Sequence, residues 1–326
     1  MPTLQRGSSG PDVQALQQKL TDLGFDPNGV DGVFGPGTEA AVRAFQQAQG
    51  LTVDGKVGPQ TNAALQAAGS GDGGTPGGST DSTNNTAGGQ KEKVLWVVGY
   101  NSLAQFLQRA QAANVTAVAI RTDNHVDQAL QPFHDAGMKV YGWRWPSAQQ
   151  GGAMAEANRA VALLAQGMDG YFADPEGEPG QPFDWNRPGL DQLADQFCTT
   201  IKSAAGAKPL GVTSHFLASQ VFPNLPWPVF FSHADILLPQ AYWRVAGGPV
   251  HHGNPAQNYR DSIQAWVQTG GARIKIQPMA GELIHSQPNE IGEYAQEANA
   301  QGVNTLHFYT DEPGVNPGVW SAIAQA

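Results

Sequence analysis

Apolar and polar positions alternate in short blocks from residue 93 onward. Eight apolar blocks have the length and composition of β-strands, at residues 94–100, 116–122, 138–145, 170–174, 209–214, 235–243, 272–279 and 305–311. Helical patterns lie between them, for example at residues 102–114, 153–167 and 289–302. Eight β–α units in about 235 residues predict an α/β fold, a (β/α)8 TIM-like barrel. An open doubly wound sheet is the alternative, although no glycine-rich phosphate loop follows any of the blocks.

A different pattern occupies residues 1–68. Apolar residues first recur at helical spacing, at Val13, Leu16, Leu20 and Leu23. The sequence VDGVFGPGTEAAV, from Val30, is then echoed by VDGKVGPQTNAAL, from Val53. Asp-Gly favours a turn, and Gly-Pro favours the start of a helix. We therefore expect a small all-α domain of three short helices joined by Asp-Gly turns.

Residues 69–92 separate the two patterns. Residues 69–90 read GSGDGGTPGGSTDSTNNTAGGQ and contain nothing that can form a hydrophobic core. We predict a flexible linker here, with a root-mean-square span of roughly 25 Å. The expected domains are therefore an all-helical domain at 1–68 and the barrel at 93–326.

Four pieces of the N-terminal pattern belong together: LQRGSSGPDVQALQQKL, LGF, VDGVFGPGTEAAVRAFQ and GLTVDGKVGPQT. In this order they strongly resemble the peptidoglycan-binding domain that is common in bacterial cell-wall hydrolases. The resemblance implies a shallow glycan groove near the Asp-Gly turns, with the candidates Asp31, Phe34, Thr38, Phe45, Gln46 and Asp54. The alternative is that Phe45 belongs to the core and that Asp31 and Asp54 only shape the turns.

Acidic residues follow the fourth predicted strand. The chemistry of (β/α)8 barrels takes place at the carboxyl ends of the strands. Residues two apart in an extended chain point to the same face, so Asp174 and Glu176 should project together toward the barrel mouth. The prolines and the glycine around them favour a turn, which would leave Glu178 aside. The alternative is an acidic loop that caps the next helix.

The other strand ends carry aromatic, acidic and amide side chains. Such a mixture is typical of a carbohydrate cleft, because aromatic faces stack on sugar rings while polar groups bind hydroxyls. The candidates for substrate contact are Tyr242, Gln240, Trp143, Trp145, Trp243, Asp311, Tyr309, Glu178, Arg121 and Glu282. For the three tryptophans, a structural role is the alternative.

The stretch DGYFADPE, at residues 169–176, is similar to the fourth-strand motif DGxDxDxE of family 18 glycoside hydrolases, the chitinase-like barrels. The residues in register are Asp169, Gly170, Asp174 and Glu176. Phe172 stands where that family has its first inner aspartate. Residues 174–176 also satisfy the Asp-x-Glu of family 25 muramidases, but the first strand ends in Tyr100–Asn101, where those enzymes have an aspartate.

The family 18 resemblance implies a role for each of these side chains. Glu176 would be the general acid, and Asp174 would orient the substrate's own N-acetyl group as the internal nucleophile. Tyr242 and Gln240 would hold that acetamido group, with Asp311 as a reserve carboxylate.

Charge narrows the class of partner. With 28 acidic and 18 basic residues the net charge is −10, which argues against nucleic acid and against an anionic membrane surface. Uncharged glycans remain allowed, and peptidoglycan or a related N-acetylated polysaccharide is the expected partner. No apolar run approaches the ~20 residues of a membrane span, and MPTLQRGSSG is not a signal peptide. We expect a monomer outside the cell or on the cell wall, released by an unconventional or phage-lysin type of route.

Neither a cofactor nor a metal is expected. The single cysteine, Cys198, excludes a disulfide framework and a cysteine-based zinc site. His251 and His252 form a pair that could bind metal, but no carboxylate at an obvious spacing accompanies them. An exposed loop pair is therefore the preferred interpretation.

The leading hypothesis is a cell-wall glycan hydrolase of the endolysin or autolysin type, a muramidase or N-acetylglucosaminidase anchored by its N-terminal domain. The alternative is a catalytically silent barrel that only binds cell-wall glycan. A metal-dependent amidase or peptidase acting on the stem peptide is a third reading.

Overall fold

The computed structural model describes residues 3–23, 25, 27, 29–48, 51–58, 60–62, 64–65 and 91–326. The chain divides into two compact units, Met1–Thr86 and Ala87–Ala326, and each is described here by itself. The linker predicted at 69–92 falls almost entirely on residues 66–90, which lie outside the described residues.

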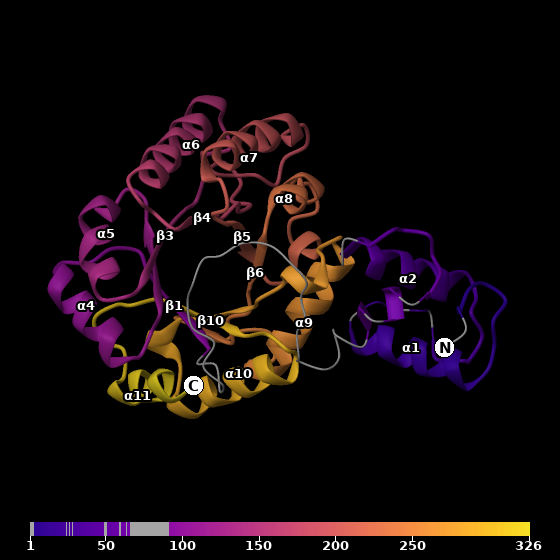
Figure 1. Ribbon diagram of the computed structural model, residues 1–326. Helices are drawn as coiled ribbons and strands as arrows, with labels where there is room; N and C mark the ends of the chain where they lie inside the picture. The colour runs from indigo at the N-terminus through magenta and orange to yellow at the C-terminus, as the bar shows by residue number, and fades with distance from the viewer. Residues whose placement is uncertain are drawn as a thin grey trace. The chain divides into compact units, whose positions relative to one another are not determined.

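The larger unit is a closed barrel of eight parallel strands (Figure 1). The strands are β1 (Glu92–Val97), β2 (Ala117–Arg121), β3 (Lys139–Arg144), β4 (Gly170–Ala173), β5 (Leu210–His215), β6 (Ile236–Gln240), β9 (Met279–Gly281) and β10 (Thr305–Tyr309). Neighbours in sequence are neighbours in the barrel, and β10 closes the ring against β1 in parallel register. A short hairpin of β7 (Arg244–Val245) and β8 (Gly248–Pro249) follows β6. The predicted α/β barrel is confirmed.

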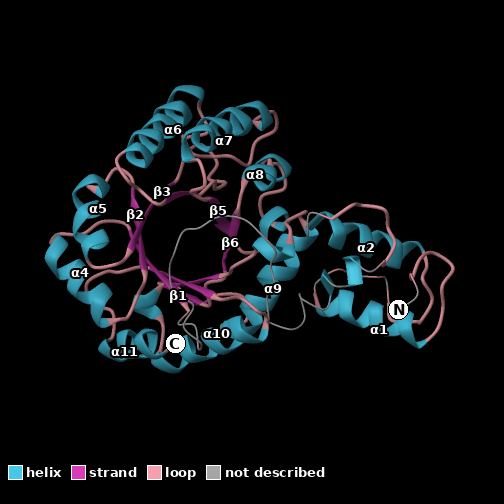
Figure 2. Ribbon diagram, in the orientation of Figure 1, coloured by secondary structure: helices cyan, strands magenta, loops and turns pink. Residues whose placement is uncertain are grey.

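Helices surround the strands on the outside of the barrel (Figure 2). They are α4 (Leu103–Ala112), α5 (Val126–Asp135), α6 (Gln150–Ala165), α7 (Asp191–Ala205), α8 (Trp227–His233), α9 (Pro255–Gln268), α10 (Pro288–Ala300) and α11 (Pro317–Gln325). Three of them begin at a proline, whose fixed φ suits the first helical position and whose missing N–H would have no partner there. Single 3-10 turns lie at Ala218–Gln220, Arg273–Lys275 and Leu283–His285.

The seventh strand differs from the prediction. A strand was expected at 272–279, but Arg273–Lys275 form a 3-10 turn and the strand is Met279–Gly281. Ile274 is 67% exposed, so its apolar side chain does not mark a buried face. Before Pro278, which has no N–H to give to the ladder, Ile276 forms an isolated parallel bridge with Leu237.

Aromatic rings fill the barrel interior. Trp96 of β1 stacks on Phe172 of β4 at a centroid distance of 5.0 Å, and Tyr141 of β3 lies 5.0 Å from the same ring. A side chain at Gly211 on β5 would collide with the Phe172 ring, so the sequence leaves that position empty. The Trp96 indole donates to His307 Nδ1 (3.2 Å), and burial lowers the pKa of His307 to about 3. The interior is therefore packed, and its histidine is neutral.

The smaller unit contains α1 (Pro11–Asp22) and α2 (Pro36–Ala48), and residues 60–62 and 64–65 are also helical. Its core gathers the apolar residues of the predicted helices and turns, including Val13, Leu16, Leu20, Phe34, Val42 and Phe45. Two short β-bridges, Leu4 with Val57 and Ser9 with Val33, hold the segments before the helices together.

The two copies of the internal sequence repeat form the same hydrogen-bond network. In the first copy the buried Gln17 side chain donates to Asp31 Oδ1 (2.8 Å), to the Val33 carbonyl (3.0 Å) and to Thr38 Oγ1 (3.0 Å). Its own oxygen accepts the Gly32 N–H at 2.7 Å. One glutamine thus satisfies the whole Asp-Gly turn.

The second copy repeats this arrangement around Gln46. Its amide donates to Asp54 Oδ1 (2.7 Å), to the Lys56 carbonyl (2.8 Å) and to Thr61 Oγ1 (3.0 Å), and its oxygen accepts Gly55 N–H (2.8 Å). A polar side chain is retained in each core because it pairs backbone groups that burial would otherwise leave unsatisfied.

We predict that Gln17→Ala lowers the free energy of unfolding of the smaller unit by about 1–3 kcal/mol, because it leaves several buried polar groups of the first turn unpaired. Amide hydrogen exchange of residues 11–22 in the full chain measures this change as faster exchange. The matched control is Gln14→Ala, on the same helix but with an exposed side chain. Equal exchange rates in the two variants would show that the Gln17 network does not stabilise the unit.

Candidate active site at the carboxyl end of the barrel

The segment after β4 holds two carboxylates on a well-anchored backbone. Asp174 N–H donates to the Arg144 carbonyl at the end of β3 (2.9 Å). The Glu176 carbonyl accepts Trp185 N–H (2.8 Å), and buried Ser214 Oγ donates to the Pro175 carbonyl (2.7 Å). Contacts from three separate parts of the barrel therefore hold the backbone that carries the two acids for which the sequence predicts a catalytic role.

Gln240, at the end of β6, joins the two carboxylates. Its Nε2 lies 2.9 Å from Asp174 Oδ1 and 3.1 Å from Glu176 Oε1. A side-chain amide has two N–H groups, so one glutamine can donate to both acids. Asp174 is buried, at 4% exposure, whereas Glu176 is partly exposed. The structure thus brings together three residues that lie up to 66 positions apart.

Burial dominates the electrostatics of this pair. It raises the pKa of Asp174 well above its usual range, helped by the charge of Glu176 and opposed by hydrogen bonds from Trp145 and Gln240. Burial likewise raises the pKa of Glu176 to about 7, although hydrogen bonds from Gln240 and Asp174 act in the opposite direction. Two interacting acids titrate as a unit, so the pair keeps at least one proton near neutral pH. Such a pair can supply a general acid.

Aromatic side chains border the pair. Tyr242 and Tyr309 stack with centroids 5.6 Å apart and planes 10° from parallel. A side chain at Gly281 would strike the Tyr242 ring, so this glycine makes room for it. Trp145 packs edge-on against Trp143 at 4.9 Å and contacts Asp174 through a hydrogen bond. Tyr242, Tyr309 and Trp145 are each partly exposed and offer aromatic surface at the barrel mouth.

Charged side chains form the rim beside Trp145. Arg121 donates to Asp123 Oδ1 (2.7 Å), and its guanidinium lies 5.8 Å from the centre of the Trp145 ring. Arg144 pairs with the other Asp123 oxygen. The sequence analysis did not single out Arg144, although it lies between two tryptophans that it named. On the opposite rim Glu282 pairs with His285 at 3.4 Å.

Four of the expected substrate contacts lie elsewhere. Trp143 has no exposed surface and donates from inside the barrel to the Val97 carbonyl (3.0 Å). Trp243 is equally buried and donates to Glu290 on α10 (3.0 Å). Both tryptophans are packing residues, as the alternative reading held.

Asp311 and Glu178 also differ from expectation. Asp311 is buried in a bidentate ion pair with Arg109 of α4, at 2.8 and 2.7 Å, so it is no reserve acid. Glu178 is exposed on the turn after the pair. Asp169 lies at the start of β4, where it accepts from Val140 N–H (2.7 Å) and pairs with His134, far from the mouth.

Some glycan candidates of the smaller unit are buried or held in hydrogen bonds, and others line a hollow. Phe34 and Thr38 are buried, and Asp31 is held by Gln17, whose hydrogen bond lowers the pKa of Asp31. Backbone and side-chain hydrogen bonds from Lys56 and Gln46 lower the pKa of Asp54. The turn around Asp54 borders a hollow of about 460 Å³ lined by Gln46, Leu51, Thr52, Asp54, Lys56, Gly58, Gln60 and Thr61. Gln46 and Asp54 are thus candidates that line a recess.

The N-terminal part of the chain is similar to known peptidoglycan-binding domains. Residues 9–65 match the family model of a putative peptidoglycan binding domain. A spore cortex-lytic enzyme of Bacillus cereus is 54% identical over 50 residues, 15% of this chain. The chain spans about a fifth, 19%, of that relative's length. The predicted peptidoglycan-binding domain is confirmed.

The barrel is similar to solved glycoside hydrolases in fold. A family 18 N-acetylglucosaminidase from Paenibacillus barengoltzii covers 72% of this chain and 99% of its own, with a TM-score of 0.53 and 12% identity. A family 18 chitinase from Cycas revoluta covers the same shares with a TM-score of 0.52 and 10% identity. At such identity the likeness concerns the fold, and it agrees with the chitinase-like barrel that the sequence analysis anticipated. Within the described residues, no helix is long and apolar enough to cross a membrane.

We predict that the stability of the barrel depends on pH because of the acid pair Asp174 and Glu176. Because the folded pKa of Glu176 is about 7 and the unfolded value about 4.3, the folded state holds more protons between these limits. The free energy of unfolding should therefore fall as pH rises from about 4.3 to 7. Urea titrations followed by tryptophan fluorescence measure the barrel, since all eight tryptophans belong to it.

The double variant Asp174→Asn/Glu176→Gln should lose most of this slope. Glu178→Gln should keep most of it, because this exposed acid makes only the smallest contribution to the raised pKa of Glu176. A double variant with the wild-type slope would show that the pair is ionised in the folded state.

Proposed function

We propose that the protein is a glycoside hydrolase of N-acetylated cell-wall glycan, held on its substrate by the peptidoglycan-binding domain. The observation that carries the proposal is the pair of buried Asp174 and partly exposed Glu176, bridged by Gln240 at the carboxyl end of the barrel. A carboxyl group with a pKa of about 7 is protonated in a large fraction of molecules at neutral pH and can act as a general acid.

Glu176 donates its proton to the glycosidic oxygen as the bond from that oxygen to the anomeric carbon breaks. The carbonyl oxygen of the substrate's N-acetyl group attacks the anomeric carbon from the other side, and Asp174 stabilises the positive charge that develops on the acetamido group. Water then attacks the anomeric carbon, the bond from that carbon to the acetamido oxygen breaks, and a proton of the water returns to Glu176. Gln240 and Tyr242 orient the acetamido group.

The surroundings of the pair suit a sugar polymer. Partly exposed Trp145, Tyr242 and Tyr309 give flat apolar surfaces for pyranose rings, and the rim charges of Arg121 and Glu282 can bind hydroxyls. An uncharged sugar chain needs no basic patch for its binding, in keeping with the net charge of −10.

The N-terminal domain supplies attachment. A domain that binds peptidoglycan raises the local concentration of the barrel at the same polymer without any new contact at the active site. We therefore place the protein at the cell wall, acting as a monomer on peptidoglycan or on another N-acetylated polysaccharide close to it.

One observation favours a second function, a catalytically silent barrel that binds glycan. Phe172 stands where family 18 has an inner aspartate, and it is packed between Trp96 and Tyr141, so no acid lies beneath Asp174. The two functions differ in whether glycosidic bonds are cut, and one assay separates them.

We predict that Glu176→Gln lowers the release of reducing ends from purified peptidoglycan by about 10²–10⁴-fold, because the general acid is lost. Wild-type activity should decline as pH rises above about 7, when Glu176 loses its proton. The matched control is Glu178→Gln, an exposed glutamate two residues further along, whose charge adds only the smallest contribution to the raised pKa of Glu176; it should keep most of the activity.

Equal rates for wild type and Glu176→Gln would contradict the assignment of the acid. If neither protein releases reducing ends while both sediment with cell wall, the silent binding barrel is the correct function.

A further inference from the structure

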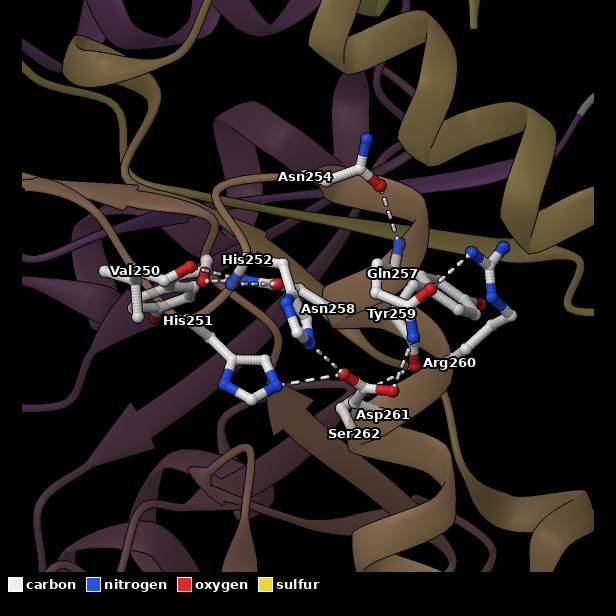
Figure 3. A network of polar contacts seen from close by, with 11 residues as sticks. Val250, His251, His252, Asn254, Gln257, Asn258, Tyr259, Arg260, Asp261 and Ser262 are labelled. Atoms are coloured by element: carbon white, nitrogen blue, oxygen red, sulfur yellow. Dashed lines mark hydrogen bonds and ion pairs between the residues drawn. The ribbon is translucent and has the colours of Figure 1, made fainter.

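Two histidines of the loop that precedes α9 meet an aspartate of α9 itself (Figure 3). His251 Nε2 lies 2.9 Å from Asp261 Oδ2, and His252 Nε2 lies 3.1 Å from the same oxygen. Among the residues that the structure describes, no other group of three His, Cys, Asp or Glu side chains brings its ligand atoms within 4.8 Å of one another.

The spacing of these atoms is close to that of a metal site. Zn²⁺ binds imidazole nitrogen and carboxylate oxygen at about 2.0–2.2 Å in a tetrahedron, which puts neighbouring ligand atoms about 3.3 Å apart. The two nitrogen–oxygen distances, 2.9 and 3.1 Å, need to open by only a few tenths of an ångström. Imidazole with one carboxylate is also a donor set that divalent first-row transition metals accept.

Neighbouring side chains orient the ligands. Gln257 Nε2 donates to Asp261 Oδ1 at 2.7 Å, which turns Oδ2 toward the histidines. Buried Asn258 accepts His252 N–H (3.3 Å) and donates to the Val250 carbonyl (3.1 Å), so it holds the loop against α9. Outer hydrogen bonds of this kind fix the geometry of metal ligands in proteins.

The cluster is open to solvent on one side. The side chains of His252, His251 and Asp261 are 52%, 30% and 22% exposed. An ion can therefore enter, and water can occupy the position that the three protein ligands leave.

We propose that His251, His252 and Asp261 form a binding site for one divalent transition-metal ion of the Zn²⁺ type. The ion ties the loop to α9. Asn258, which holds this loop, also donates to the Tyr242 carbonyl at 2.9 Å, so the site supports the backbone of a residue in the candidate active site. The sequence analysis found no carboxylate for the histidine pair because Asp261 lies ten positions after His251, on a helix that returns past the loop.

The test is zinc binding by the full chain, prepared without a polyhistidine tag and stripped of metal with a chelator. Calorimetric titration with ZnCl₂, with bound zinc counted by mass spectrometry, should give one ion per chain. Asp261→Asn, which preserves the shape of the side chain, should weaken binding at least tenfold. Gln257→Ala should weaken zinc binding by about tenfold, because the Asp261 carboxylate loses the hydrogen bond that orients it.

The matched control is Asp195→Asn. Asp195 accepts from His233 Nε2 at 2.8 Å, a pair of the same chemistry with a single histidine, and its loss should leave zinc affinity unchanged. The proposal is overturned if the wild-type chain binds no stoichiometric zinc, or if Asp261→Asn binds it as tightly as wild type. Neither result depends on glycan hydrolysis.

Discussion

A closed barrel of eight parallel strands must fill its own interior, and here aromatic rings fill it. Trp96, Tyr141, Trp143 and Phe172 form the packed centre, and even His307 is held neutral there by burial. Phe172 and Asp174 are two residues apart and therefore face the same way, so the acid lies directly above an apolar floor. Burial of the carboxylate raises its pKa.

The polar groups that remain at the mouth are satisfied by partners from several strands. Gln240 donates to both acids, and Ser214 and Arg144 hold the backbone between them. The smaller unit uses the same device twice, since Gln17 and Gln46 each satisfy an Asp-Gly turn. In the smaller unit each of these buried side-chain amides stabilises a turn that hydrophobic packing alone would leave with unpaired groups.

The parts of the site that were predictable lie close together in the sequence or at the ends of well-marked strands. Asp174 and Glu176 follow from the alternation of an extended chain, and Gln240, Tyr242 and Trp145 from their places after strands. Trp243 was misplaced because one residue beyond Tyr242 the side chain turns outward, to α10. Asp311 was misread because its partner, Arg109, lies 202 positions earlier.

The sequence by itself determined the order of the elements, the closed α/β barrel, the peptidoglycan-binding domain and the acid pair after the fourth strand. Each of these follows from hydrophobic periodicity or from motifs of residues that are close together in the sequence. Only the tertiary structure decided which rings fill the interior, which carboxylates are bound by arginine, and that Asp261 meets His251 and His252. These outcomes depend on contacts between residues far apart in the chain, and the direction of each side chain is settled when the barrel closes.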